Sequence, residues 1–307
     1  MHKSNYAGKD PEQLELKHLL YSKKDRVATV TINRPHAHNA LNFETVRELH
    51  RVFEDVTWDD AIAVMVLTGA GEKAFCTGAD IKQWHDEFMS HPGDFYKWMG
   101  AFIEMHDRLR NIGKPTVARL NGIVVGGGNE LNMACDLAIA ADDIYIRQVG
   151  PARGSVPAAG ATQWLPLIVG DRRAREILLL CEEIPAAKAL DWGLVNRVVP
   201  REQLDNAVRE ITEKLINKLP EVTRYTKQQL NVWRDLSWGI TIGHARDWLT
   251  VHTSAPEIFE GIDSFKNKRP IDYEKVRNGL LAQCSSCGAT MPVRYSFCGA
   301  CGKEFTA

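Results

Sequence analysis

The sequence predicts an α/β fold that is followed by a helical region and a small cysteine-rich unit. Over residues 1–200, short apolar runs typical of strands alternate with longer amphipathic stretches typical of helices. The segment 201–281 has a mainly helical pattern, and the segment 282–307 contains four cysteines in two close pairs. We therefore expect three units with these boundaries.

Strand and helix signals follow one another through the first unit. The strands are expected at 26–32, 63–67 and 115–120, and the helices at 44–56, within 80–111, and from about Asn129 onward. Because each connecting helix must return the chain to the start of the next strand, this order favours a mostly parallel sheet covered by helices.

The composition gives no sign of a nucleic-acid or membrane partner. Charged residues make up 25% of the chain and the formal net charge is -1, so no global field attracts polyanions. The first residues are polar and lack the apolar run of a signal peptide, which predicts a soluble, cytoplasmic protein. Cys76, Cys135 and Cys181 lie singly among apolar neighbours and are expected to be buried thiols.

A glycine-rich turn is the first candidate for chemistry. Gly126, Gly127 and Gly128 precede a helix, so their N–H groups are open to an oxyanion at the positive end of the helix dipole. Glu130 follows closely, and a carboxylate in a desolvated cleft can act as an acid or base. The alternative is a packing turn followed by a helix-capping glutamate.

Two common cofactor motifs are absent from this turn. The G-x-G-x-x-G spacing of dinucleotide-binding folds is not present, and no Gly-Lys-Ser/Thr follows as in a phosphate-binding loop. Both cofactor classes are therefore disfavoured.

A wider set of motifs resembles the crotonase (enoyl-CoA hydratase) superfamily, in the order that this family shows over about residues 14–275. The resemblance implies the ββα spiral fold and an acyl-CoA substrate. The motifs are Asn33-Arg-Pro35, Asn39-Ala-Leu41, Ala74-Phe-Cys-Thr-Gly-Ala-Asp-Ile-Lys82, Lys114-Pro115, Asn121-Gly122, Gly126-Gly-Gly-Asn-Glu130, Ala134-Cys-Asp136, Glu260-Gly261 and Lys268-Arg-Pro270.

The resemblance also implies roles for individual residues. The oxyanion N–H donors fall on Ala79 and Gly127, and the first catalytic glutamate falls on Glu130. Asp136 is expected to be structural. The coenzyme A part of the substrate is expected along His36, Ala37, His38, Ala40, Ala79, Asp80, Ile81, Lys82 and Gly127. A metal site at His36 and His38 is the alternative for these two histidines.

Oligomer assembly is implied by the resemblance alone. Members of the family form trimers or dimers of trimers, so we expect a homotrimer or hexamer with contacts in the helical region 201–281. A nonenzymatic acyl-CoA-binding protein is the alternative from another class, and the retained donor positions and Glu130 count against it.

One departure from the hydratase pattern points to a subclass. Hydratases with two catalytic glutamates carry the second at the position of Gly150. The surrounding sequence, including Ser155 and Pro157, resembles ring-processing members such as 6-oxocyclohex-1-ene-1-carbonyl-CoA hydrolase, from which it departs at Arg153. The resemblance suggests hydration or hydrolytic C–C cleavage of a cyclic acyl-CoA, with room for a ring at Gly150. An ordinary enoyl-CoA hydratase or isomerase acting on linear substrates is the alternative. For a cyclic substrate, Arg153 is either a group that polarises a ring carbonyl or the partner of a nearby acid.

The last four cysteines predict a structural zinc site. Cys284 and Cys287 form one Cys-x-x-Cys-Gly motif, and Cys298 and Cys301 form the second. Four thiolates complete a tetrahedral shell around one zinc ion, which leaves no open position for catalysis. Redox disulfides are one alternative, and a nucleic-acid-binding ribbon is another, for which nearby basic residues are few.

Overall fold

Two β-sheets lie at the centre of the molecule, in a computed structural model that describes residues 8–89, 91–253, 255–279, 281–292 and 295–304. The larger sheet pairs β1 with β2 antiparallel, and every later pair is parallel. Its strands in spatial order are β1 (Leu19–Lys24), β2 (Val27–Ile32), β3 (Val64–Gly69), β5 (Thr116–Leu120), β7 (Leu137–Ala141) and β10 (Arg197–Val199).

The second sheet is smaller than the first. Its first three strands are parallel and the last pair is antiparallel. In spatial order they are β4 (Ala74–Cys76), β6 (Ile123–Val125), β8 (Tyr145–Arg147) and β9 (Ile184–Pro185). Since β4 follows β3 and β6 follows β5, each pass of the chain contributes one strand to each sheet, as expected for the crotonase spiral.

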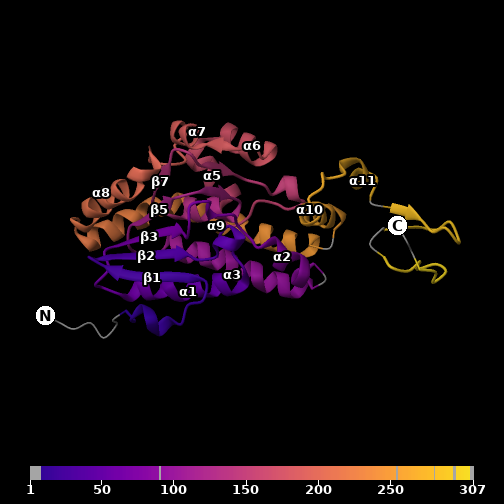
Figure 1. Ribbon diagram of the computed structural model, residues 1–307, viewed down its shortest axis with the longest axis horizontal. Coiled ribbons are helices and arrows are strands. Elements are labelled where there is room, and N and C mark those ends of the chain that lie inside the picture. Colours follow the sequence, from indigo (N-terminus) through magenta and orange to yellow (C-terminus); the bar gives the residue numbers. More distant parts are fainter. Residues whose placement is uncertain (1–7, 90, 254, 280, 293–294, 305–307) are drawn as a thin grey trace.

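Helices surround the sheets and dominate the C-terminal half (Figure 1). In chain order they are α1 (Phe43–Trp58), α2 (Ile81–Gln83), a π-helix (Trp84–Phe88), α3 (Pro92–Arg110), α4 (Gly127–Ala134), α5 (Ala161–Val169), α6 (Asp171–Leu180), α7 (Ala186–Asp191), α8 (Leu204–Ile216), α9 (Pro220–His252), α10 (Pro256–Lys266) and α11 (Tyr273–Arg277). Short 3-10 turns occur at Pro11–Leu14, Pro35–Ala37, Pro151–Arg153 and Arg201–Gln203. Among the described residues, no helix combines the length and apolar character needed to cross a bilayer.

The expected elements are confirmed with small shifts of their ends. The three expected strands correspond to β2, β3 and β5, and the helix expected near Asn129 begins at Gly127. The amphipathic region 80–111 is divided, because α3 begins anew at Pro92 after the π-helix. Strand β1 and the short strands of the second sheet were not predicted, since three-residue strands such as β4 carry too little periodicity.

Several of the sequence motifs prove to be internal supports. Asp136 is structural as expected: its Oδ2 accepts hydrogen bonds from Thr116 N at 2.8 Å and from Lys227 Nζ at 2.8 Å. Asn121 donates to Gly69 O at 2.8 Å and so ties β3 to the chain after β5. Cys76, Cys135 and Cys181 are buried free thiols, also as expected.

Helix α10 packs against the 3-10 turn Pro151–Arg153 through two glycines. A Cβ on Gly261 would lie 2.2 Å from Arg153 O, and one on Gly154 would lie 2.0 Å from Glu257 O. The two backbones therefore touch directly, which no other residue type permits. Arg269 donates to both carboxylate oxygens of Glu260, at 2.5 and 2.8 Å, and this pair anchors the turn after α10.

The C-terminal cysteine unit projects beyond α10 and α11, at the end of the molecule away from the N-terminus (Figure 1). Its hairpin pairs β11 (Leu281–Gln283) with β12 (Thr290–Pro292) in antiparallel register. The hairpin is too small to bury a core, so its stability must come from elsewhere.

The glycine contact yields a stability prediction. Gly261→Ala should destabilise the fold by about 1–3 kcal/mol, because the added methyl overpacks α10 against Arg153 O. Gly100→Ala is the matched control: this residue lies within α3, and a Cβ added there would have no neighbour within 4 Å, so alanine should stabilise by about 0.5–1 kcal/mol. Urea denaturation measures both, and equal effects would contradict the close contact.

Candidate active site

A cavity of about 500 Å³ brings together residues that lie far apart in the sequence, from Ala37 to Phe265. Its walls come from the loop before α2, the N-terminus of α4, the segment 145–158 and the C-terminal helices. The four residues expected to take part in catalysis all line it, namely Ala79, Gly127, Glu130 and Arg153.

Two free N–H groups lie side by side in this cavity. A Cβ on Gly78 would be 2.7 Å from Gly127 N, so the chain before Ala79 contacts the first turn of α4. Neither Ala79 N nor Gly127 N has an acceptor among the residues that the structure describes. Gly126 makes this possible, because its φ of 54° and ψ of -119° turn the chain sharply into the helix. Two unpaired N–H groups next to each other are what an oxyanion hole requires.

The side chain of Glu130, in the first turn of α4, lies in the cavity and does not cap the helix. It is buried, with 4% exposure, and Oε1 accepts a hydrogen bond from Ala158 N at 3.1 Å. Burial raises the pKa of this carboxyl well above its ordinary value, and the single N–H bond only partly offsets that effect. Glu130 does not cap α4, so the alternative of a helix-capping glutamate is wrong.

The loop expected to bind coenzyme A lies at the cavity with one exception. Ala37, His38, Ala40, Ala79, Asp80, Ile81 and Lys82 line the cavity, whereas His36 does not. The carboxylate of Asp80 is already engaged: it forms a salt bridge with Arg34 at 2.8 Å and caps α2 through Lys82 N. Asp80 is thus a structural member of the cavity wall.

The expectation that Gly150 leaves room for a ring is wrong. A Cβ at this position would lie 2.9 Å from Pro157 N and 3.1 Å from Ser155 O. The loop folds back on itself here, and Ser155 N donates to Gly150 O at 2.9 Å. Glycine is therefore needed for loop packing, and the cavity volume lies beside the loop.

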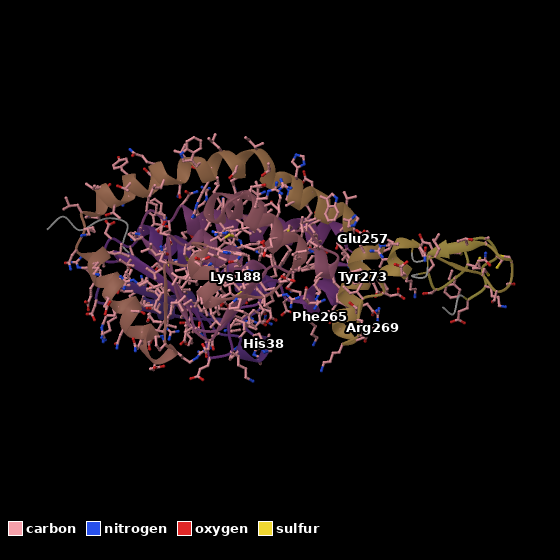
Figure 2. The ribbon with its side chains drawn as sticks, turned by 90° about the horizontal axis from the view of Figure 1, so that it is seen from above. His38, Lys188, Glu257, Phe265, Arg269 and Tyr273 are labelled. Carbon is pink, nitrogen blue, oxygen red and sulfur yellow. The ribbon has the colours of Figure 1, made fainter. Side chains whose placement is uncertain are left out.

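Arg153 has no acidic partner among the described residues. Its guanidinium donates to Ala152 O at 2.9 Å and lies 5.2 Å from the centre of the Phe265 ring. The expected alternative, in which Arg153 pairs with a nearby acid, is therefore not observed. Phe265 belongs to α10 and lines the cavity, as does His38; both residues are labelled in Figure 2.

A wall of stacked aromatic rings was not predicted from the sequence. Trp98 stacks on Phe102 at 5.0 Å, and Trp84 stacks on Phe95 at 4.9 Å. Trp84, Trp98 and Phe102 line the cavity, and Trp84 Nε1 is tied to Thr253 Oγ1 at 3.3 Å. The helical spacing of these aromatic residues is the same as that of an ordinary core face, so sequence reasoning could not assign them to a site.

The C-terminal helices close the cavity from the other side. Leu249 of α9 and Ile262 and Phe265 of α10 line it, and these residues were also missed by sequence reasoning. Only the fold brings them to Glu130, which lies far away in the sequence.

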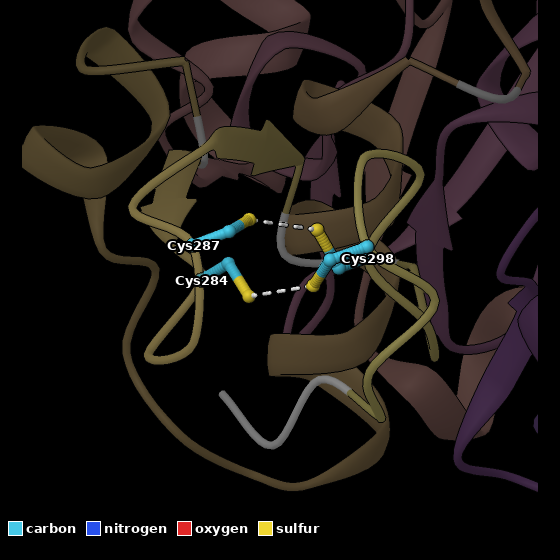
Figure 3. Close-up of side chains that lie close together, drawn as sticks. Cys284, Cys287 and Cys298 are labelled. Carbon is cyan, nitrogen blue, oxygen red and sulfur yellow. Dashed lines mark hydrogen bonds between the residues drawn. The ribbon is translucent and has the colours of Figure 1, made fainter.

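The four C-terminal cysteines converge as expected (Figure 3). Their sulfurs all lie within 4.8 Å of one another, with Cys284 Sγ 3.8 Å from Cys301 Sγ and Cys287 Sγ 3.6 Å from Cys298 Sγ. Zinc–sulfur bonds of about 2.3 Å in a tetrahedron put the sulfurs about 3.8 Å apart, whereas a disulfide needs about 2.05 Å. The donor set and its geometry therefore fit one four-coordinate metal ion.

Matching backbone turns support the two halves of this cluster. Gly288 N donates to Cys284 O at 2.9 Å, and Gly302 N donates to Cys298 O at 2.7 Å. Both glycines have positive φ, of 72° and 73°, which the tight turn after the second cysteine of each pair requires. The repeat explains why each motif ends in glycine.

Comparisons with known proteins agree with this site. Residues 22–276 match the family model described as enoyl-CoA hydratase/isomerase. An enoyl-CoA hydratase from Mycobacterium avium subsp. paratuberculosis K-10 is 25% identical, with a TM-score of 0.76 over 84% of this chain and 98% of that one. An enoyl-CoA hydratase from Bacillus anthracis is 29% identical, with a TM-score of 0.68 over 83% and 98% of the two chains.

A relative with a different reaction also matches. A monofunctional enoyl CoA isomerase from M. smegmatis is 30% identical, with a TM-score of 0.61 over 71% of this chain and 94% of that one. Because the family model spans most of its length, this chain belongs to the crotonase superfamily of enoyl-CoA hydratases and isomerases, as an acyl-CoA enzyme.

Proposed function

We propose that this enzyme hydrates a cyclic enoyl-CoA or hydrolytically opens a cyclic β-oxoacyl-CoA. The observation that carries the proposal is that Glu130 is the one cavity-lining carboxylate outside a salt bridge in the described part of the chain. With no acid at Gly150, the enzyme lacks the second carboxylate of a two-glutamate hydratase. The flat aromatic faces of Trp84, Trp98 and Phe102 favour a ring over a flexible chain.

The geometry supports a mechanism through a thioester enolate. Glu130 takes a proton from water, and the hydroxide adds to the ring carbonyl at the β-position. The C–C bond to the α-carbon then breaks, and its electron pair becomes the enolate whose oxygen binds the N–H groups of Ala79 and Gly127. Glu130 returns its proton to the α-carbon, so one water is consumed and one carboxylate is formed.

The raised pKa of Glu130 suits this proton transfer. The raised proton affinity makes the Glu130 carboxylate a stronger base toward water, and the carboxyl group that forms can pass the same proton to the α-carbon. Arg153 lies on the same loop as Ala158, whose N–H group binds Glu130. Arg153 also lines the cavity, so its cation would polarise the ring carbonyl.

Isomerisation of a linear or cyclic enoyl-CoA is the second candidate. A single carboxylate can remove a proton from one carbon and return it to another without activating water, so Glu130 alone suffices. Ordinary hydration of a linear enoyl-CoA is a weaker alternative, because that reaction uses the second acid in the family. In all of these reactions the coenzyme A part is proposed to lie along His38, Ala40 and Lys82.

We propose that Cys284, Cys287, Cys298 and Cys301 hold one structural zinc ion. Support comes from the sulfur separations, which match the edges of a zinc tetrahedron. All four positions of the ion would be filled by thiolates, so zinc would stabilise the hairpin and take no part in acyl-CoA chemistry.

We also propose that α9 mediates a homotrimer or hexamer. Among its exposed side chains are Leu230 at 71%, Trp233 at 71% and Ile240 at 74% exposure. Large apolar groups in a row on one helix are a common sign of a subunit contact.

The reaction is tested by incubating the purified protein with paired cyclic and linear acyl-CoAs and identifying the products by mass. A ring-opened or hydrated cyclic product should form faster than hydrated crotonyl-CoA. Glu130→Gln should lower turnover by about 100-fold or more while binding is kept, because only the proton carrier is lost. Conversion of crotonyl-CoA alone would contradict the ring assignment, and a double-bond shift without added water would establish isomerisation.

The buried carboxyl predicts a pH-dependent stability difference. Because the folded protein binds the Glu130 proton more tightly than the unfolded chain, the contribution of this proton to stability is complete below pH 4.5 and is lost as pH rises toward the raised pKa. Glu130→Gln should therefore match the wild type in acid and exceed its thermal stability at alkaline pH. A difference in Tm that stays constant with pH would show that the carboxyl is not desolvated.

Metal analysis of unchelated protein tests the cysteine cluster. The expected stoichiometry is one zinc per chain, and Cys287→Ser should lose it because a tetrahedral site needs all four ligands. Cys181→Ser is the control, since this buried thiol lies outside the cluster and should leave zinc content unchanged. Full zinc retention in Cys287→Ser would refute the ligand assignment.

Light scattering after size exclusion tests the assembly. The wild type should elute as a trimer or hexamer, and Trp233→Glu should shift it toward the monomer, because a buried unpaired charge weakens an apolar contact. Leu20→Glu is the control, since Leu20 is also exposed, at 55%, but lies on β1. A monomeric wild type would exclude the proposed role of α9.

A further inference from the structure

Lys82 and Arg153 are the cavity-lining Lys and Arg side chains that form no salt bridge among the described residues, and of the two only Arg153 is half-buried, since Lys82 is exposed. The Arg153 side chain contacts the carbonyl of Ala152 and the ring face of Phe265. No carboxylate lies within 4.0 Å of it among the described residues. Arg147, which also lines the cavity, differs because it donates to Cys181 O at 2.6 Å and faces Glu183 at 3.7 Å.

The acids near Arg153 are engaged with other groups. Asp80 pairs with Arg34 at 2.8 Å, and Glu257 pairs with His252 at 2.9 Å. Glu130 is buried and accepts a hydrogen bond from Ala158 N. A partly desolvated cation without a counterion is costly in a folded protein, so an external anion is the natural partner for this guanidinium.

The backbone under Arg153 is held firmly. Arg153 N donates to Gly150 O at 2.9 Å, and the contacts of Gly154 and Gly261 lock the turn against α10. The same loop provides Ala158 N to Glu130, and both Arg153 and Glu130 line the cavity. A guanidinium on a fixed backbone can bind a carboxylate through two parallel hydrogen bonds.

We propose that Arg153 binds a carboxylate at the far end of the acyl group, so that the cavity accepts acyl-CoA molecules with a terminal carboxylate. The proposal rests on the proposed function in one respect: hydrolytic ring opening converts the ring carbonyl into such a carboxylate. In that step water supplies OH to the carbonyl carbon, the C–C bond breaks toward the α-carbon, and the new acid releases its proton to solvent. Arg153 would thus polarise the ring carbonyl in the substrate and then bind the carboxylate that forms from it in the product.

Binding of unreactive ligands tests this assignment without turnover. Saturated acyl-CoAs of equal chain length are compared by calorimetry, one ending in a methyl group and one in a carboxylate. The wild type should bind the carboxylate form about 10- to 100-fold more tightly, as one charge-assisted bidentate contact allows. Arg153→Gln should abolish this ratio while affinity for the methyl form is kept, and Arg153→Lys should retain part of it.

Arg147→Gln is the matched control, because Arg147 lines the same cavity but already has partners. It should leave the ratio unchanged. Equal binding of both ligands by the wild type would refute the proposal whatever the variants do, and so would a ratio that survives Arg153→Gln or disappears in Arg147→Gln. If the wild type prefers the carboxylate ligand but opens no ring, the carboxylate site is supported and the ring-opening reaction is refuted. If it opens a ring but shows no preference for the carboxylate ligand, the reaction is supported and the carboxylate site is refuted.

Discussion

The close approach of α4 to strand β4 is the constraint on which the site depends. A Cβ on Gly128 would lie 2.0 Å from Cys76 O, so only glycine lets the helix start this near the strand. That contact puts Gly127 N beside Gly78, and neither Gly127 N nor Ala79 N has an acceptor among the described residues. It also buries the first turn of α4, which desolvates Glu130 and raises its pKa. The position of the free N–H groups and the raised pKa of Glu130 therefore both follow from this one backbone contact.

A second backbone contact makes the C-terminal region part of the active site. Gly154 and Gly261 bring α10 against the loop that holds Arg153, and Ile262 and Phe265 complete the cavity wall. The salt bridge between Glu260 and Arg269 holds the turn that follows. Helices from the end of the chain thus shape one wall of the cavity, while the first half of the chain supplies Ala79, Gly127 and Glu130.

The electrostatics of the cavity are simple for its size. Asp80 is neutralised by Arg34, Glu130 holds its proton strongly, and Arg153 is a cation without an acidic partner in the described chain. Around these groups the walls are largely apolar and aromatic. Low polarity strengthens each remaining charge interaction, so a few groups can govern both reaction and selectivity.

Local sequence determined the features that depend on local backbone geometry. The glycine turn with Glu130 and the two Cys-x-x-Cys-Gly motifs could be identified because turn conformation and ligand spacing are properties of a few adjacent residues. Tertiary structure alone decided that Gly150 is crowded by Pro157, that Asp80 is paired, and that His36 lies off the cavity. It also decided that the aromatic face of α3 borders a cavity, because helical spacing shows which side of a helix is buried but not what that side is buried against.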